Sequence, residues 1–142
     1  MEIISEPMEY LYRAKMKYDN LPRKKGDWVY GDLVRMQDGK TYAPTIYGCG
    51  EVEEKTICAY TNIDIGGKKC FDKDIISIVQ CEFGEKPHTV YFQVIFSKRF
   101  GLWTVAKADG KVAGASLASY ARDATTKIVG NIFDNPELLK DK

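Results

Sequence analysis

Histidine and closely paired cysteines are the scarcest features of this sequence. It has one histidine, and none of its four cysteines stands in a C-x-x-C pair. Zinc knuckles and dithiol redox motifs use that spacing, so the sequence gives no indication of either. A reducing cytosol keeps thiols free, and cysteine packs well as a small apolar side chain. We therefore expect unbridged, structural cysteines at Cys49, Cys58, Cys70 and Cys81.

Charge of one sign and long apolar runs are also lacking. The formal net charge is +1, which provides no overall electrostatic attraction to nucleic acid or to a membrane. The longest apolar stretch, Val90 to Phe96, is interrupted by Gln93 and is far too short to cross a bilayer. The segment Met1 to Pro7 has neither the basic part nor the apolar part of a secretory signal. These features predict a cytoplasmic protein with no membrane partner.

Catalytic groups are equally sparse. Any Cys-His or Ser-His pair would have to use His88, which stands in a polar, loop-like stretch beside Pro87. Asp72 and Asp74 would share one face of an extended segment and, with Asp64, could bind Mg²⁺ as in a metal-dependent nuclease. Aspartates beside glycine and lysine are, however, more often turn formers. We predict no enzymatic activity, no metal and no cofactor, and we keep the nuclease as a third hypothesis.

What the chain does contain is typical of a folded β protein. Its 142 residues suit one domain, and 44% hydrophobic with 29% charged residues matches soluble globular proteins. Segments that alternate apolar and polar residues recur between glycine-containing turns. Helical spacing occurs only in Ala115–Ala124 and in Pro136–Lys140, where Asn135 is placed as an N-cap. The expected strands are Tyr10–Lys17, Trp28–Met36, Thr41–Tyr47, Lys55–Tyr60, Asp74–Phe83, Thr89–Phe96, Leu102–Ala106 and Ile128–Phe133, with Asp19–Gly26 and Asn62–Lys69 as loops.

One local cluster departs from the neutral average. Between Leu11 and Gly26 a series of cations stands against the single acid Asp19, and aromatic side chains are interleaved with them. In an extended strand Arg13, Lys15 and Lys17 project from one face. Surfaces that bind single-stranded nucleic acid combine cations, which contact phosphates, with aromatic rings, on which bases stack. A solvated edge strand, whose lysines prevent aggregation, explains the same pattern. The candidate binding residues are Arg13, Lys15, Lys17, Arg23, Lys24, Lys25 and Trp28.

Three segments resemble motifs of the YopX-like family of bacteriophage and prophage proteins, over about Met8 to Leu139. The third, Ile128 to Leu139, is similar to the family's C-terminal signature nearly residue for residue. The first two are Arg13-Ala14-Lys15 with Trp28-Val29-Tyr30-Gly31, and Thr56 to Thr61 with Gly67-Lys68-Lys69 and Asp74-Ile75-Ile76. The motif residues, for which we predict structural roles, are Trp28, Tyr30, Gly31, Tyr60, Thr61, Gly67, Asp74, Gly130, Asn131, Asn135 and Pro136.

The resemblance implies an SH3-like β-barrel as the central unit of a mostly β fold. We expect a single domain over 1–142, with N-terminal strands in 1–50 and the barrel core and C-terminal elements in 51–142. One α-helix near 115–124 and a short C-terminal helix complete it. The family usually has glycine where this chain has Asn62 and Lys73. Asparagine tolerates a left-handed conformation, whereas lysine is less comfortable if its turn needs a positive φ.

Backbone physics explains the motif residues without a ligand. Gly31, Gly67 and Gly130 should stand at turns or strand ends where φ is positive or a side chain would clash. Asp74 can accept hydrogen bonds from turn amides and so fix the register of its strand. Asn135 with Pro136 should begin the last helix.

The resemblance brings a phage or prophage origin but no biochemical role, and a fold of this type does not define one. We predict a non-enzymatic accessory protein of the bacterial host cytoplasm that binds a host or phage protein. The near-zero net charge favours a protein partner, and nucleic-acid binding through the basic segment is the alternative. Unpaired strand edges are compatible with a homo-oligomer but specify no symmetry.

Overall fold

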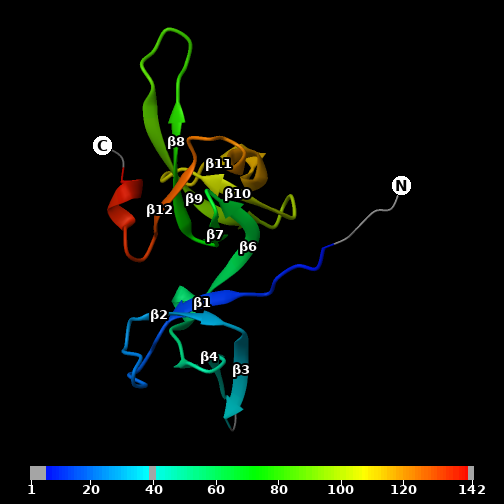
Figure 1. Cartoon of the computed structure of the whole chain (residues 1–142), viewed down its shortest axis with the longest axis vertical. Coiled ribbons are helices and arrows are strands. Elements are labelled where there is room, and N and C mark those ends of the chain that lie inside the picture. The colour runs from blue at the N-terminus through cyan, green and yellow to red at the C-terminus, as the bar shows by residue number, and fades with distance from the viewer. Residues whose placement is uncertain (1–5, 39–40, 141–142) are drawn as a thin grey trace. The chain divides into compact units, whose positions relative to one another are not determined.

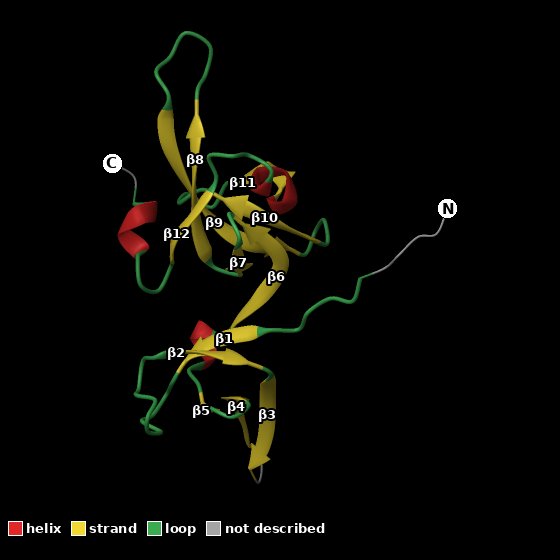
Figure 2. Ribbon diagram, viewed as in Figure 1, coloured by secondary structure: helices red, strands yellow, loops and turns green. Residues whose placement is uncertain are grey.

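The protein is built almost entirely of β-strands, which confirms the mostly β prediction (Figures 1 and 2). The structure is a computed structural model and describes residues 6–38 and 41–140. The chain forms two compact units, Met1–Asn62 and Ile63–Lys142. The boundary between the two units falls inside strand β6 (Cys58–Ile65). From the sequence we expected the N-terminal strands to end at residue 50 and the barrel core to begin at residue 51.

The first unit consists of short antiparallel strands around a small core. β1 pairs with β2 on one side and with the start of β6 on the other, and β3, β4 and β5 form a separate sheet. Its buried core contains Ala14, Met16, Val29, Ile46, Cys49 and Val52. The elements are β1 (Tyr12–Lys15), β2 (Trp28–Gly31), β3 (Leu33–Asp38), β4 (Thr41–Ile46), β5 (Gly50–Glu51) and the 3-10 helix η1 (Glu54–Thr56).

Gly31 divides the single strand that we expected over Trp28–Met36. Its φ is 155°, and a Cβ at this position would lie 3.1 Å from Cγ2 of the buried Ile46. The chain therefore leaves β2 at Gly31, and β3 begins at Leu33 in the other sheet. The predicted structural role of this glycine is confirmed.

The second unit contains a curled half-barrel sheet and an α-helix. Five antiparallel strands follow the order β11-β10-β9-β8-β12, and the end of β6 pairs with β7. The core contains Ile65, Cys70, Ile76, Ile78, Phe92, Val94, Val105 and Leu117. The elements are β7 (Lys68–Phe71), β8 (Asp74–Gln80), β9 (His88–Ser97), β10 (Leu102–Ala106), β11 (Val112–Ser116), α1 (Leu117–Ala121), β12 (Lys127–Asn131) and the 3-10 helix η2 (Pro136–Leu139).

Two central expectations were wrong. The predicted strand Lys55–Tyr60 starts as η1 and becomes β6 only at Cys58. The predicted loop Asn62–Lys69 is instead the end of β6, a turn at Gly66 and Gly67, and the start of β7. Both of these glycines have positive φ, 59° and 79°, so the pair forms a tight turn and not a long loop.

The helices are shorter than expected. Residues 115 and 116 belong to β11, and α1 begins at Leu117, with the Ser116 hydroxyl accepting a hydrogen bond from the Ser119 amide. That contact is an N-cap. The C-terminal helix has Pro136 in its first turn as predicted, but it is a 3-10 helix, and the Asn135 side chain makes no capping hydrogen bond to it.

Among the residues that the structure describes, two non-glycine residues adopt left-handed backbone conformations. Asn62 has φ 61° and Lys73 has φ 67°. These are the two positions where the resemblance implies glycine, so the turn before Asp74 does require a positive φ. Across the described residues, no helix combines the length and the apolarity needed to span a membrane.

Candidate functional site

The basic strand of the first unit carries its cations against a tryptophan. Cζ of Arg13 lies 4.8 Å, and Nζ of Lys15 lies 5.2 Å, from the centroid of the Trp28 ring, which confirms that the two cations share one face of β1. Arg13, however, is only 7% exposed. The expectation that it projects into solvent is wrong, because cation–π contact with Trp28 covers it.

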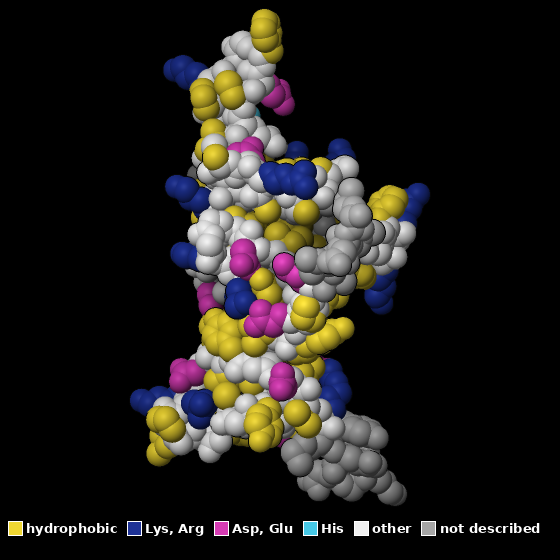
Figure 3. Space-filling model, turned by 45° about the vertical axis from the view of Figure 1, so that its right-hand side comes forward, with side chains coloured by type: hydrophobic (Ala, Val, Ile, Leu, Met, Phe, Trp, Pro, Cys, Tyr) yellow, Lys and Arg dark blue, Asp and Glu magenta, His cyan; other side chains and the backbone are white. Residues whose placement is uncertain are grey.

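The other predicted cations do not form one continuous surface. Nζ of Lys17 lies 3.3 Å from the Glu51 carboxylate, and this hydrogen bond raises the pKa of the lysine. Lys24 and Lys25 are exposed on the loop before β2, where Arg23 is half-buried. Figure 3 shows lysine and arginine side chains dispersed over the visible face of each unit. The structure therefore separates the predicted basic cluster into covered, paired and loop cations.

The three aspartates of the nuclease hypothesis have different surroundings. Asp74 is 1% exposed, and its Oδ2 accepts a 2.8 Å hydrogen bond from the Phe71 amide. This contact confirms its predicted role in the turn. Asp72 precedes the left-handed Lys73, so the extended alternation that would align Asp72 with Asp74 is interrupted. Asp64 is exposed on β6, and no metal-binding group of three His, Cys, Asp or Glu side chains occurs within 6–38 and 41–140.

The remaining reactive side chains are also dispersed. His88 is exposed and begins β9, so it lies on a strand and not in the predicted loop. All four cysteines are unbridged thiols, as expected. Cys49, Cys58 and Cys70 are buried, whereas Cys81 is exposed just after β8.

The C-terminal motif forms a compact network after β12. Asn131 is 8% exposed, and its Oδ1 accepts hydrogen bonds from the amides of Phe133 (3.0 Å) and Asp134 (2.9 Å). The backbone amide of Asn131 donates to Oδ1 of Asn135 at 3.3 Å, and the backbone amide of Asn135 donates to the carbonyl of Asn131 at 2.9 Å. These bonds reverse the chain and place η2 against β9. Asn131 and Asn135 thus hold the reversal after β12 by hydrogen bonds within the motif.

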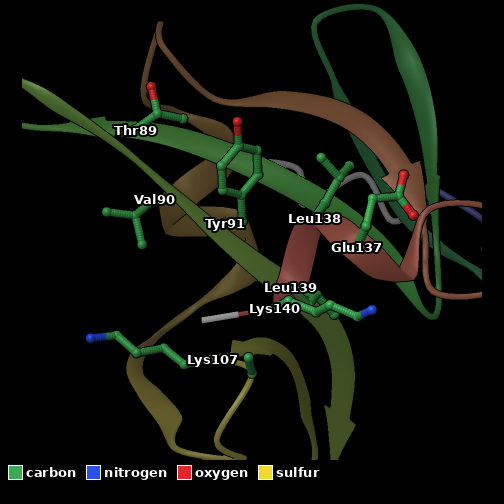
Figure 4. Close-up of a pocket in the computed structure, with 9 residues that line it drawn as sticks. Thr89, Val90, Tyr91, Lys107, Glu137, Leu138, Leu139 and Lys140 are labelled. Carbon is green, nitrogen blue, oxygen red and sulfur yellow. The ribbon is translucent and has the colours of Figure 1, made fainter. Parts of the chain in front are cut away.

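The network places η2 beside a groove of about 380 Å³ in the second unit (Figure 4). In the figure, Thr89 and Tyr91 project from the same side of β9, as alternate strand residues do, and Leu138 of η2 stands beside the Tyr91 ring. Tyr91 and Leu138 are half-buried. The groove is lined by Thr89, Val90, Tyr91, Lys107, Ala108, Glu137, Leu138, Leu139 and Lys140.

The groove combines an apolar wall with two hydroxyl groups and two ammonium groups. Lys107 and Lys140 are exposed at its rim, and so is the single carboxylate of Glu137. A ring and leucine side chains can cover an apolar group, while hydroxyls and cations can orient an acidic one. This arrangement fits binding of a segment that presents an apolar side chain together with a carboxylate.

Sequence reasoning missed this groove because its parts are far apart in the chain. Thr89 and Tyr91 belong to a predicted strand, and Leu138 belongs to a predicted helix, but nothing in either segment specifies their contact. The one available signal was the C-terminal motif, since a helix that follows such a tightly bonded reversal must pack on something nearby.

Comparison with known families agrees with the residue pattern. The family described as YopX protein matches residues 8–140, nearly the span over which the motifs were recognised. No curated protein matches the sequence significantly. Because the family match covers almost the whole chain, the protein belongs to the YopX family.

Proposed function

We propose that this protein is a non-enzymatic binding module that recognises a host or phage protein through the groove between β9 and η2. The protein would be encoded by a phage or prophage and act in the bacterial cytoplasm. Its ligand would be a protein segment that inserts an apolar side chain beside Tyr91 and Leu138 and pairs a carboxylate with Lys107 or Lys140.

One observation carries this proposal: the family's C-terminal motif builds a wall of the groove. Gly130, Asn131 and Asn135 make the contacts that fix the reversal after β12, and the reversal positions η2. Half-buried apolar side chains with a few polar groups at the rim are typical of sites that bind a partner's side chain. The motif therefore positions η2, which forms one wall of the proposed binding surface.

Nucleic-acid binding receives less support from the geometry. A surface for single strands needs exposed cations beside exposed rings. Here Arg13 is buried against Trp28 and Lys17 is paired with Glu51, so only part of the predicted cluster offers charge to phosphates. We keep this function as the alternative that the experiment distinguishes.

The test is a capture experiment with matched variants. Tagged protein is incubated with host lysate, with and without nuclease, and retained proteins are identified by mass spectrometry. The groove variant is Lys107→Glu with Lys140→Glu. The control variant is Lys68→Glu with Lys127→Glu, which changes the same charge at exposed lysines of the same unit outside the groove.

We expect one discrete protein that survives nuclease, is retained by the wild type and the control, and is lost from the groove variant. Binding of that purified protein, measured by calorimetry, should weaken at least tenfold for the groove variant alone. Capture that disappears on nuclease treatment would support the nucleic-acid alternative. Equal retention by both variants would exclude the groove as the site.

A further inference from the structure

The turn between β8 and β9 presents one phenylalanine to solvent. The strand ladder ends at the pair of Gln80 and His88, and residues 81–87 connect the two strands. The Glu85 amide donates a 2.9 Å hydrogen bond to the Glu82 carbonyl, which closes a turn around Phe83 and Gly84. Phe83 is 107% exposed, more than any other large hydrophobic side chain among the described residues. In Figure 3 hydrophobic atoms mark this end of the unit, at the top of the view.

An apolar groove distinct from the β9–η2 groove lies where the pairing of β10 with β11 is irregular. Thr104 pairs with Ser116 and Ala106 pairs with Val112, so one residue of β10 stands opposite three of β11. The extra residues form a bulge, and the Thr104 hydroxyl donates a 2.7 Å hydrogen bond to the Ala115 carbonyl in the gap. A groove of about 320 Å³ results.

The lining of this groove is apolar and accessible. Phe100 is 64% exposed, Leu102 is 38% exposed and Val112 is 49% exposed. The bulged residues Ala113 to Ala115 have small side chains or none, so they leave room for a ring. An open apolar groove of this kind is suited to an aromatic side chain from outside.

Charge distinguishes the two features. The residues next to the groove in sequence are Lys98 and Arg99 before Phe100, and Lys111 before Val112, with Asp109 as the acid nearby. The turn that carries Phe83 has two carboxylates, on Glu82 and Glu85, and one ammonium group, on Lys86. The groove is therefore flanked by net positive charge and the turn by net negative charge.

We propose that Phe83 of one copy of this protein inserts into the β10–β11 groove of a second copy. The two complementary surfaces lie at different places on the same unit, so the contact is head-to-tail. In such a pair one copy keeps a free groove and the other keeps a free turn, so the association can continue into rings or open chains. This self-association is independent of partner binding at the β9–η2 groove.

The test uses variants that disable one surface each. Phe83→Ser removes the ring, and Leu102→Lys places a charge in the groove. Leu21→Ser and Val129→Lys are the controls, because Leu21 is 79% exposed in the other unit and Val129 has the same 38% exposure as Leu102 on another strand. Circular dichroism and melting temperature verify that each variant is folded, and Phe100→Ser replaces Leu102→Lys if that variant is not.

Light scattering after size-exclusion chromatography then measures mass against protein concentration. We expect the wild type and both controls to grow beyond the monomer as concentration rises, and each surface variant to stay monomeric. An equimolar mixture of Phe83→Ser and Leu102→Lys should form a dimer that grows no further, since it contains one intact turn and one intact groove. A monomeric wild type, or a mixture that stays monomeric while the wild type associates, would overturn the proposal.

Discussion

The side chain of Asn135 occupies the space that a side chain on Gly130 would need. A Cβ built on Gly130 would contact Oδ1 of Asn135 and lie 2.6 Å from its Cγ and 2.9 Å from its Cβ. Real Cβ atoms do not approach other atoms so closely. The φ of Gly130 is not positive, so backbone conformation does not explain why this position holds glycine. The glycine is thus required by packing, and its partner is part of the same motif.

Substituting Gly130 should therefore loosen the reversal that holds η2. We expect Gly130→Ala to lower the free energy of unfolding by about 1–3 kcal/mol, the usual cost of an overpacked site. Urea denaturation measures this change. Proteolysis near residues 132–140 should also become faster, because the hydrogen bonds between Asn131 and Asn135 are strained first.

A double variant separates the clash from other effects of alanine. In Gly130→Ala with Asn135→Gly the contacted side chain is absent, so the cost should be clearly smaller than the sum of the two single substitutions. Interaction energies of about 0.5–3 kcal/mol are usual for residues in contact. Simple additivity would show that Gly130 acts through something other than Asn135.

The same substitution should have opposite effects at the two left-handed residues. Lys73→Gly relieves a backbone strain of about 1–2 kcal/mol and increases unfolded-state entropy by about 0.4–1 kcal/mol, so we expect a small net stabilisation. Asn62→Gly should destabilise by about 1 kcal/mol, because the Asn62 side chain bonds both the amide (2.8 Å) and the carbonyl (3.0 Å) of Glu9. Thermal and urea denaturation of both variants would check the signs. Equal signs would contradict this account.

Local patterns were sufficient where a strand alternates strongly or ends at a clear turn. β10 has the predicted bounds Leu102–Ala106, and β8 follows from the run of isoleucines that begins at Ile75. β11 was missed because Ala113, Gly114 and Ala115 have no period-two contrast and alanine favours helices. The pair Gly66-Gly67 favours a loop over Asn62–Lys69 in the sequence, but in the structure it forms the tight turn between β6 and β7.

The candidate sites depended on contacts that no local pattern reveals. The alternation of β1 predicts which residues share a face with Arg13, but not that Trp28 of the neighbouring strand covers that face. Likewise, the exposure of Phe83 could not be foreseen, because the predicted strand extended to that residue. Whether such side chains are covered or exposed depends on the pairing of strands that are distant in sequence, and only the folded structure shows that pairing.

Asp74 should be one of the least replaceable polar residues in the second unit. It is 1% exposed, and its Oδ2 accepts from the Phe71 amide at 2.8 Å. Removing a buried acceptor leaves the donor unsatisfied, which costs about 1–3 kcal/mol. We expect Asp74→Ala to destabilise by at least that amount in urea denaturation, whereas Asp109→Ala, at an exposed turn, should change stability little.

The first unit should show a small acid sensitivity from one exposed ion pair. The Arg35 guanidinium donates two hydrogen bonds to Glu54, at 2.7 Å and 2.9 Å, and holds the pKa of that carboxyl below its usual value. Because the folded pKa is lower than the unfolded one, the pair stabilises above the usual pKa of glutamate, and this contribution is lost as the pH falls. Glu54→Gln should remove that part of the pH dependence in melting curves recorded from neutral to acidic pH. The effect is small because both side chains are exposed.

Single-stranded nucleic acid provides the direct test of the basic N-terminal segment. Lys24 and Lys25 are its exposed cations, and phosphate contacts make binding fall steeply with salt. Because Arg13 and Lys15 lie over the Trp28 ring and Lys17 pairs with Glu51, we expect no salt-sensitive binding of a labelled oligonucleotide in fluorescence anisotropy at low ionic strength. Lys24→Glu with Lys25→Glu should then give the same signal as the wild type. If the wild type binds, and the affinity drops both with salt and in this variant, the loop is a nucleic-acid site and the alternative function is the correct one.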